Sequence, residues 1–167
     1  LNPMKPKGRE IVENLVKTAD IVIANLPQPT LEAMGIDYDS LRAIKPDIIL
    51  TTVTAYGNGG PYSERVGFDG VAQALAGATY MGGRPGDPMK SFVPFADFGT
   101  ATMAAFGTLS ALIERNKTGN GQLVEAALTR TVMAFNIALL AEEAIKSIDR
   151  PSYGNRGYSA GPSDIFK

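Results

Sequence analysis

The sequence has 167 residues, of which 44% are hydrophobic and 20% charged, and its formal net charge is −1. A chain of this length can bury a core, and its near-neutral charge argues against nucleic acid as a partner. The absence of cysteine and histidine excludes disulfides, thiolate and imidazole metal ligands, cysteine nucleophiles and serine–histidine catalysis. No apolar run approaches the length of a membrane span and the first residues do not resemble a signal peptide, so we expect a cytoplasmic protein that uses no metal and no membrane.

The first half of the chain has the pattern of a βαβ unit. We expect a surface helix, a strand, two short helices and a second strand over residues 8–19, 20–24, 31–34, 39–44 and 47–53. Both strands are short β-branched runs without alternation, which is typical of strands buried on both faces of a parallel sheet. Asn25 and Leu26 follow the first strand at its carboxyl end, where ligands of open α/β sheets bind.

A turn-rich loop over residues 56–62 follows the second strand. Gly57 and Gly59 have the spacing of the first two glycines of a dinucleotide fingerprint, but Tyr62 takes the third position and no helix begins there. An ordinary turn is therefore favoured over a nucleotide site. From the residues alone, packing is also the favoured explanation of Tyr56 and of Phe68.

The second half predicts a helix, a Gly/Pro loop, a short extended segment, a long helix, a strand and a last helix. We expect them over residues 68–76, 77–88, 91–93, 98–113, 122–126 and 128–145. The helix over 98–113 carries no charge and is apolar nearly all round, so it needs neighbours on every side. Residues from 149 onward have many Gly and Pro and no periodicity, so they either cross to another domain or stay mobile.

Asp97 is the only charged residue between residues 94 and 113. An aspartate directly before a helical run is a favoured N-cap, because its carboxylate accepts unpaired backbone N–H groups of the first turn. Most such aspartates are only caps. A carboxylate held by backbone donors would keep its charge at neutral pH, as a nucleophile must, and the loops at Asn25, Tyr56 and Gly83 could converge near it.

The chain resembles the central part of the family III CoA-transferases. The resemblance rests on three segments in the family's order, ADIVIANLPQPTLEAMGIDYDSLRAIKPDIIL, AYGNGGPYSERVGFDGVAQALAG and PFADFGTATMAAFGTLSALIERNKTGNGQLVEAAL. It implies an α/β fold with a Rossmann-like parallel sheet and flanking helices. Residues 1–148 would be part of the large domain that carries the nucleophile, and residues 149–167 would begin the linker towards a second domain.

The resemblance also implies a chemistry. Asp97 corresponds to the family's nucleophile, which moves coenzyme A from an acyl-CoA donor to a carboxylic acid through an aspartyl mixed anhydride and an aspartyl-CoA thioester. Asn25 and Leu26 match the segment that holds the nucleotide part of CoA, and we expect Tyr56 and Phe68 to complete the CoA site. The working unit implied is an interlocked homodimer.

Two alternatives stay open at this point. The first is an acyl-CoA racemase, but members of that branch pair the aspartate with a histidine where this chain has Phe68, so a second base such as Asp69 would be needed. The second is a non-catalytic segment that only binds CoA or supports dimerisation. The sequence does not identify the donor and acceptor acids.

Overall fold

A computed structural model describes residues 1–166 as eight helices and three strands. In chain order they are α1 (Pro6–Thr18), β1 (Ile21–Ala24), α2 (Gln28–Met34), α3 (Tyr38–Ile44), β2 (Ile49–Thr54), α4 (Asp69–Leu75), α5 (Ala78–Gly82), α6 (Phe95–Thr118), β3 (Leu123–Ala127), α7 (Leu128–Phe135) and α8 (Ile137–Lys146). No described residue after Lys146 belongs to a helix or strand.

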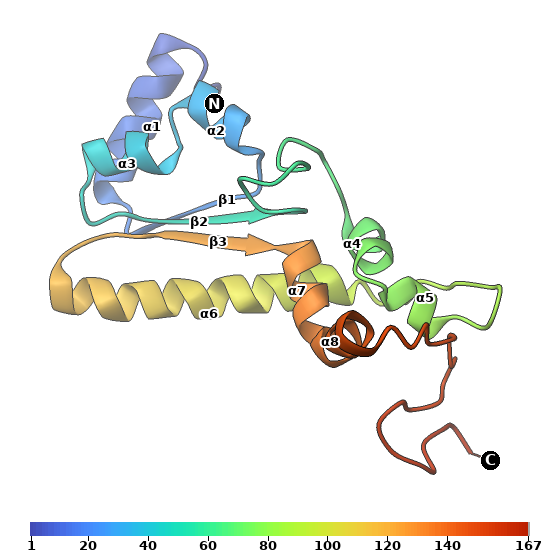
Figure 1. The fold of residues 1–167 in the computed structure, drawn as a ribbon. Coiled ribbons are helices and arrows are strands. Elements are labelled where there is room, and N and C mark those ends of the chain that lie inside the picture. The colour runs from blue at the N-terminus through green and yellow to red at the C-terminus, as the bar shows by residue number, and fades with distance from the viewer. Residues whose placement is uncertain (167) are drawn as a thin grey trace.

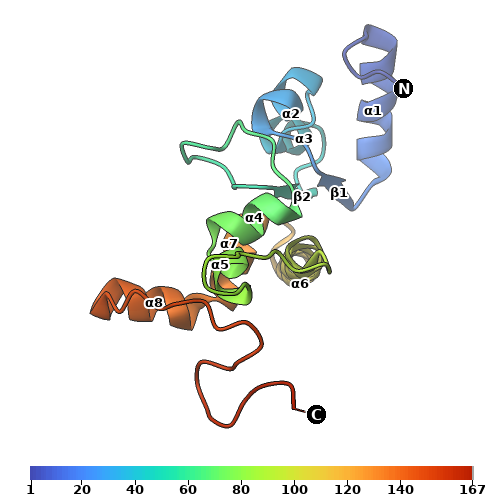
Figure 2. The same ribbon diagram turned by 90° about the vertical axis from the view of Figure 1, so that its right-hand side faces the viewer.

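The three strands form one parallel sheet in the order β1-β2-β3. Val22 of β1 lies opposite Leu50 of β2, and Leu50 lies opposite Leu123 of β3. Helices α1, α2 and α3 lie over one face of this sheet and α6 runs along the other, while α4, α5, α7 and α8 gather beyond the carboxyl ends of the strands (Figures 1 and 2). The expected α/β fold with a parallel sheet and flanking helices is confirmed.

The centre of the sheet is held from both faces by β2. Successive side chains of a strand point to opposite faces. Leu50 packs into a buried cluster with α1, α2 and α3, whereas the hydroxyl of Thr51 hydrogen-bonds that of Thr108 of α6 at 2.6 Å. The cluster contains Val16, Ala24, Leu31, Leu41, Ile48 and Leu50. A second cluster joins α4, α6 and α7 and contains Ala72, Ala76, Ala96, Leu128 and Val132.

Among residues 1–166, the long helix α6 is packed on one side only. Its inner side carries small residues that approach the sheet and α7 closely, namely Ala96, Thr100, Ala104, Thr108 and Ala111, all of them buried. Its opposite side exposes four large apolar residues: Phe98, Phe106, Leu109 and Ile113. We call these four residues the outer stripe. The helix begins at Phe95 and ends at Thr118, so it is longer at both ends than the sequence predicted.

Three other expectations are wrong in detail. The helix expected over 128–145 is two helices, because Asn136 leaves helical geometry between α7 and α8 and its Nδ2 donates to the carbonyl oxygen of Ala76 at 3.1 Å. The loop expected over 77–88 contains the short helix α5. The first strand is not buried on both faces, since Ile23 of β1 is 72% exposed. Within the described residues, β1 pairs with β2 and has no strand on its other side.

Candidate active site

The first turn of α6 brings Asp97 to the carboxyl-end edge of the sheet. The strands all point towards this edge, and α6 begins there and runs back in the opposite direction (Figure 1). The side chain of Asp97 is exposed, and it takes part in no hydrogen bond or ion pair within residues 1–166. Its carboxylate is therefore free to meet a ligand at this edge.

Asp97 does not cap the helix, which corrects the prediction from the sequence. The N-cap position belongs to Pro94, and Asp97 is the third helical residue. The carboxylate of Asp69, at the start of α4, does the capping: its Oδ1 accepts the backbone N–H of Ala96 at 2.9 Å and that of Asp97 at 3.4 Å. The cap thus comes from a residue 28 positions earlier in the chain, a relation that a local pattern of sequence does not reveal.

The pKa of Asp97 is raised above the ordinary carboxyl value. Partial burial of the carboxylate is the larger cause, and the negative charge of Asp69 is the second. The expectation that backbone donors hold the Asp97 carboxylate is wrong, because those donors bind Asp69 instead. A carboxylate with a raised pKa is more basic, and among nucleophiles of one kind the intrinsic reactivity of the ionised form rises with basicity.

The residues expected to bind CoA lie in the loops at the same edge, but in different settings. Asn25 is exposed directly after β1, whereas Leu26 is half-buried and packs against the cluster under α1, α2 and α3. Tyr56, two residues after β2, packs edge-on against the ring of Tyr62, with 5.5 Å between their centroids. Phe68 is 72% exposed immediately before α4 and so adjoins Asp69.

The structure therefore joins some of these residues and not others. Phe68, Asp69 and Asp97 form one neighbourhood through the hydrogen bond from the Asp97 backbone to Asp69. No hydrogen bond within residues 1–166 links Asn25 or Tyr56 to Asp97. Their assignment to a CoA site stays a prediction.

Sequence reasoning missed the contribution of Gln73. This residue is fully buried on α4, one turn after Asp69, and its Nε2 donates to Oδ2 of Asp69 at 2.6 Å. The spacing of an acid and an amide four residues apart in the expected helix over 68–76 was a usable signal, since such side chains are neighbours on a helix. It would not have shown that the pair faces the start of another helix.

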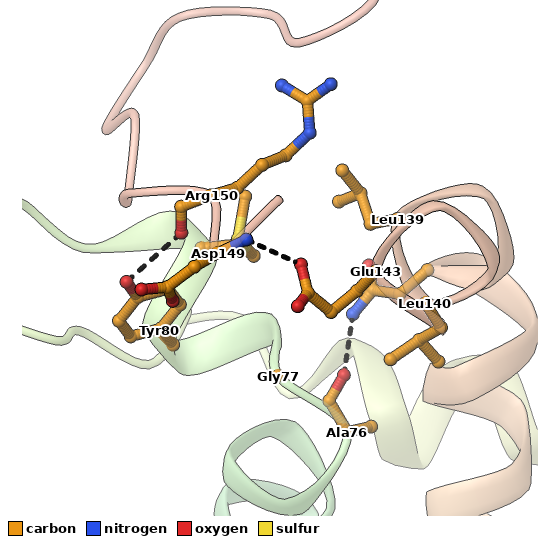
Figure 3. A pocket seen from close by; sticks show the side chains of 10 residues that line it. Ala76, Gly77, Tyr80, Leu139, Leu140, Glu143, Asp149 and Arg150 are labelled. Carbon is orange, nitrogen blue, oxygen red and sulfur yellow. Dashed lines mark hydrogen bonds between the residues drawn. The ribbon is translucent and has the colours of Figure 1, made fainter. Parts of the chain in front are cut away.

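A cavity of about 250 Å³ lies away from Asp97, between the α4–α5 region, α8 and the segment that follows α8 (Figure 3). The Tyr80 hydroxyl donates to the carbonyl oxygen of Arg150 at 3.1 Å, and the backbone N–H of Asp149 donates to Glu143 at 2.9 Å. The walls of the cavity are mostly apolar and are formed by Ala76, Gly77, Tyr80, Met81, Asn136, Leu139, Leu140, Glu143, Asp149 and Arg150. Asp97 does not line it, so this cavity is not the place where that carboxylate would react.

In the part of the chain that the structure describes, no three carboxylates come together in the way that metal ligands do. Among the helices over residues 1–166, none combines the length and the apolar character needed to cross a membrane.

Comparisons with known proteins agree with one another. The model of the family described as CoA-transferase family III matches residues 1–167. The human succinyl-CoA:glutarate CoA-transferase is 32% identical over all of this chain and 38% of its own length, and the succinyl-CoA–D-citramalate CoA-transferase of Chloroflexus aurantiacus is 32% identical over 96% of this chain and 40% of its own. A crystal structure of a CAIB/BAIF family protein from Brucella suis has a TM-score of 0.87 and 34% identity over 97% of this chain and 43% of its own.

Proposed function

The chain belongs to CoA-transferase family III, and from that premise we propose that the whole protein transfers CoA from an acyl-CoA donor to a carboxylic acid, with Asp97 as the nucleophile. The chain spans about two fifths of the length of the curated relatives that it matches. The named relatives act on succinyl-CoA with glutarate or D-citramalate as partner acid. A small dicarboxylic acid is accordingly the substrate class to test first.

The chemistry proposed conserves the energy of the thioester. An oxygen of the Asp97 carboxylate attacks the donor carbonyl carbon, the C–S bond breaks, and a mixed anhydride and the CoA thiolate result. The thiolate attacks the aspartyl carbonyl carbon, the donor acid leaves as a carboxylate, and an aspartyl-CoA thioester remains. The acceptor carboxylate attacks that thioester, releases the thiolate and forms a second mixed anhydride with Asp97. The thiolate then attacks the acceptor's carbonyl carbon in this anhydride, and the Asp97 carboxylate leaves. The products are the acceptor's CoA thioester and a free Asp97 carboxylate, with no net gain or loss of protons.

The observation that carries this proposal is the free carboxylate of Asp97 at the edge where the strands end. Its own backbone N–H is occupied by Asp69, but its side chain has no partner within residues 1–166 and has a raised pKa. An ordinary structural aspartate at a helix start would bind backbone N–H groups and have a lowered pKa, as Asp37 does at the start of α3. The contrast supports a chemical role for Asp97.

We extend the proposal to the binding of CoA. Exposed Asn25 and exposed Phe68 are assigned to direct contact with CoA, and Tyr56, packed against Tyr62, to a wall of the same site. Leu26 is assigned to holding the loop after β1, because its side chain packs into the interior. An interlocked homodimer in the cytoplasm, with residues 149–167 leading towards a second domain, is the setting proposed for this site.

The alternative of a racemase is less well supported. Both carboxylate oxygens of Asp69 already accept hydrogen bonds, from Gln73 and from the backbone of Ala96 and Asp97, so a role as second base would break the cap of α6. Phe68 has no group that can exchange a proton. A non-catalytic role as a binding segment predicts that the complete protein transfers CoA equally well without the Asp97 carboxylate.

The test uses the complete protein with succinyl-CoA and a panel of free acids, followed by hydroxylamine trapping and peptide mass analysis. We expect hydroxamate on Asp97 alone and no transfer by Asp97→Ala. Asp39→Ala is the matched control, because Asp39 is also an exposed aspartate in a first helical turn, that of α3. Full transfer by Asp97→Ala, or trapping at another carboxylate, refutes the assignment.

A further inference from the structure

A chain of buried polar groups connects α4 to the start of α6. Asp69 is 7% exposed and Gln73 is fully buried, although both are polar. Burying such groups is costly unless every one of them is hydrogen-bonded. Each has its partners here, and the partners lie in the segment that leads into the turn carrying Asp97.

The start of α6 has no cap of its own. Pro94, at the N-cap position, has no side-chain acceptor for the first-turn N–H groups. The N–H of Phe95 finds the carbonyl oxygen of Val93 at 2.8 Å, and the N–H groups of Ala96 and Asp97 share Oδ1 of Asp69. Two of the groups that a helix start leaves unpaired are thus satisfied from another helix.

The other oxygen of Asp69 is fixed as well. Oδ2 accepts from Nε2 of Gln73 at 2.6 Å, and Oε1 of Gln73 in turn accepts the backbone N–H of Ser91 at 2.8 Å. The segment from Ser91 to the first turn of α6 is therefore tied to α4 at two points. The position of the Asp97 backbone follows from these ties.

We propose that Asp69 is a positioning residue for Asp97: by capping α6 in place of Asp97 it fixes the first turn, leaves the Asp97 carboxylate free to attack, and sets a second negative charge behind it. This inference rests on the proposed function of Asp97. A buried like charge favours the protonated form of its neighbour and makes the ionised form more basic. The pKa of Asp97 is raised in part by Asp69, as this arrangement requires.

The other charged groups near the start of α6 act less directly. The elements packed against α6 carry Glu125 on β3 and Arg130 on α7, and Lys90 lies in the segment before the helix with its side chain against Gly70 of α4. Within residues 1–166 none of these three forms an ion pair or hydrogen bond with Asp97. The pKa of Asp97 should therefore change when the charge of Asp69 is removed.

The experiment measures kcat, KM and the pH dependence of kcat for CoA transfer by the complete protein. Asp69→Asn keeps one side-chain oxygen for the helix N–H groups but removes the charge. The new amide nitrogen is a donor, and it would face Nε2 of Gln73, which is also a donor. We expect kcat to fall about 10- to 100-fold, as small displacements of reacting groups do, with KM for the acyl-CoA within about twofold of wild type. The acid limb of the kcat profile, where Asp97 must ionise, should move to lower pH because the pKa of Asp97 falls.

A second variant separates geometry from charge. Gln73→Leu breaks both ties of Gln73 and leaves the Asp69 carboxylate, so kcat should fall while the acid limb stays where it is in wild type. Asp37→Asn is the matched control, since Asp37 is a buried cap of α3 whose Oδ1 accepts the Ser40 N–H at 3.1 Å. It should lose folded stability but keep wild-type kcat and the wild-type acid limb.

The outcomes distinguish this inference from the proposed function. Transfer by Asp97→Ala, measured alongside, would refute the proposed function itself. If Asp97→Ala is inactive but Asp69→Asn keeps kcat and an unmoved acid limb, or changes KM alone, the positioning role is overturned. If Asp69→Asn does not fold, Gln73→Leu decides, and wild-type kcat in that variant overturns the proposal.

Discussion

Replacing Phe106 by lysine tests whether the outer stripe of α6 is covered in the complete protein. In residues 1–166 this ring is 70% exposed, and its stripe neighbours Phe98, Leu109 and Ile113 are 68%, 59% and 59% exposed. Monomeric soluble proteins rarely leave such a continuous apolar strip open to water. We therefore predict that other parts of the complete protein cover the stripe, either the rest of the polypeptide or a partner subunit.

The size of the effect follows from the exposed area. A phenylalanine side chain buries roughly 200 Å² when it is fully enclosed, so covering the remaining 70% removes about 140 Å² from water. At about 25 cal/mol per Å² this is worth about 3.5 kcal/mol. Phe106→Lys loses that contribution and places an ammonium group in an apolar contact, so we expect the complete protein to lose about 3–5 kcal/mol of unfolding free energy.

The assay makes two measurements on wild type and on Phe106→Lys. One is the urea unfolding of the complete protein, and the other is the solubility of residues 1–167 expressed alone. The isolated chain should aggregate or pack loosely, and Phe106→Lys should make it more soluble while it destabilises the complete protein. Asn116→Lys, on an exposed polar position of the same helix, is the control and should change stability by less than about 0.5 kcal/mol. A complete protein indifferent to Phe106→Lys would refute the prediction, as would a wild-type isolated chain that melts cooperatively as a monomer.

Three further predictions concern charge, proton exchange and packing. Because the pKa of Asp97 is raised on folding, its ionised form destabilises the fold; Asp97→Asn should raise the melting temperature at neutral pH, and the gain should shrink as pH falls through the raised pKa and vanish below the ordinary value of 3.8. A gain in melting temperature that grows as the pH falls would contradict this prediction. Solvent deuterium should not enter the α-carbon of a 2-methylacyl-CoA at a rate near turnover, as followed by NMR, and rapid exchange would make Asp69 a base after all. Gly121→Ala would bring a Cβ into collision with the carbonyl oxygen of Ile48 and should cost about 1–3 kcal/mol in urea unfolding, whereas Gly60→Ala meets open space and should cost little.

Much of the fold could be predicted from local pattern. The β-branched runs at residues 20–24 and 47–53 and the helical spacing between them determined a parallel βαβ unit, and the structure has it. Asn136 could not be recognised as a break, because the residues on both sides of it continue the apolar pattern of a helix. Its departure from helical geometry goes with a hydrogen bond to Ala76, 60 positions away in the sequence.

The candidate site could be predicted only in part, because it too depends on contacts between residues far apart in the sequence. The isolation of Asp97 among uncharged residues singled it out as a candidate, and the resemblance to a family supplied its expected role. The rule that an aspartate before a helical run caps that run was misleading, since Asp69 on α4 performs the capping. Which carboxylate reaches the helix start depends on how α4 packs against α6, and one sequence does not contain that information in any local form.

The two ties between α4 and the start of α6 also close a loop. The chain leaves α4 after Leu75 and returns at Ser91, where Gln73 binds the backbone N–H of Ser91, while Ala76 at the start of the segment stays in the buried cluster. Doubling the length of a flexible closed loop adds only about 0.6 kcal/mol to its closure entropy. We therefore expect the first turn of α6 to keep its place when Tyr80 and Met81, which line the cavity of Figure 3, are replaced or the loop after them is lengthened, provided that Ala76 is retained.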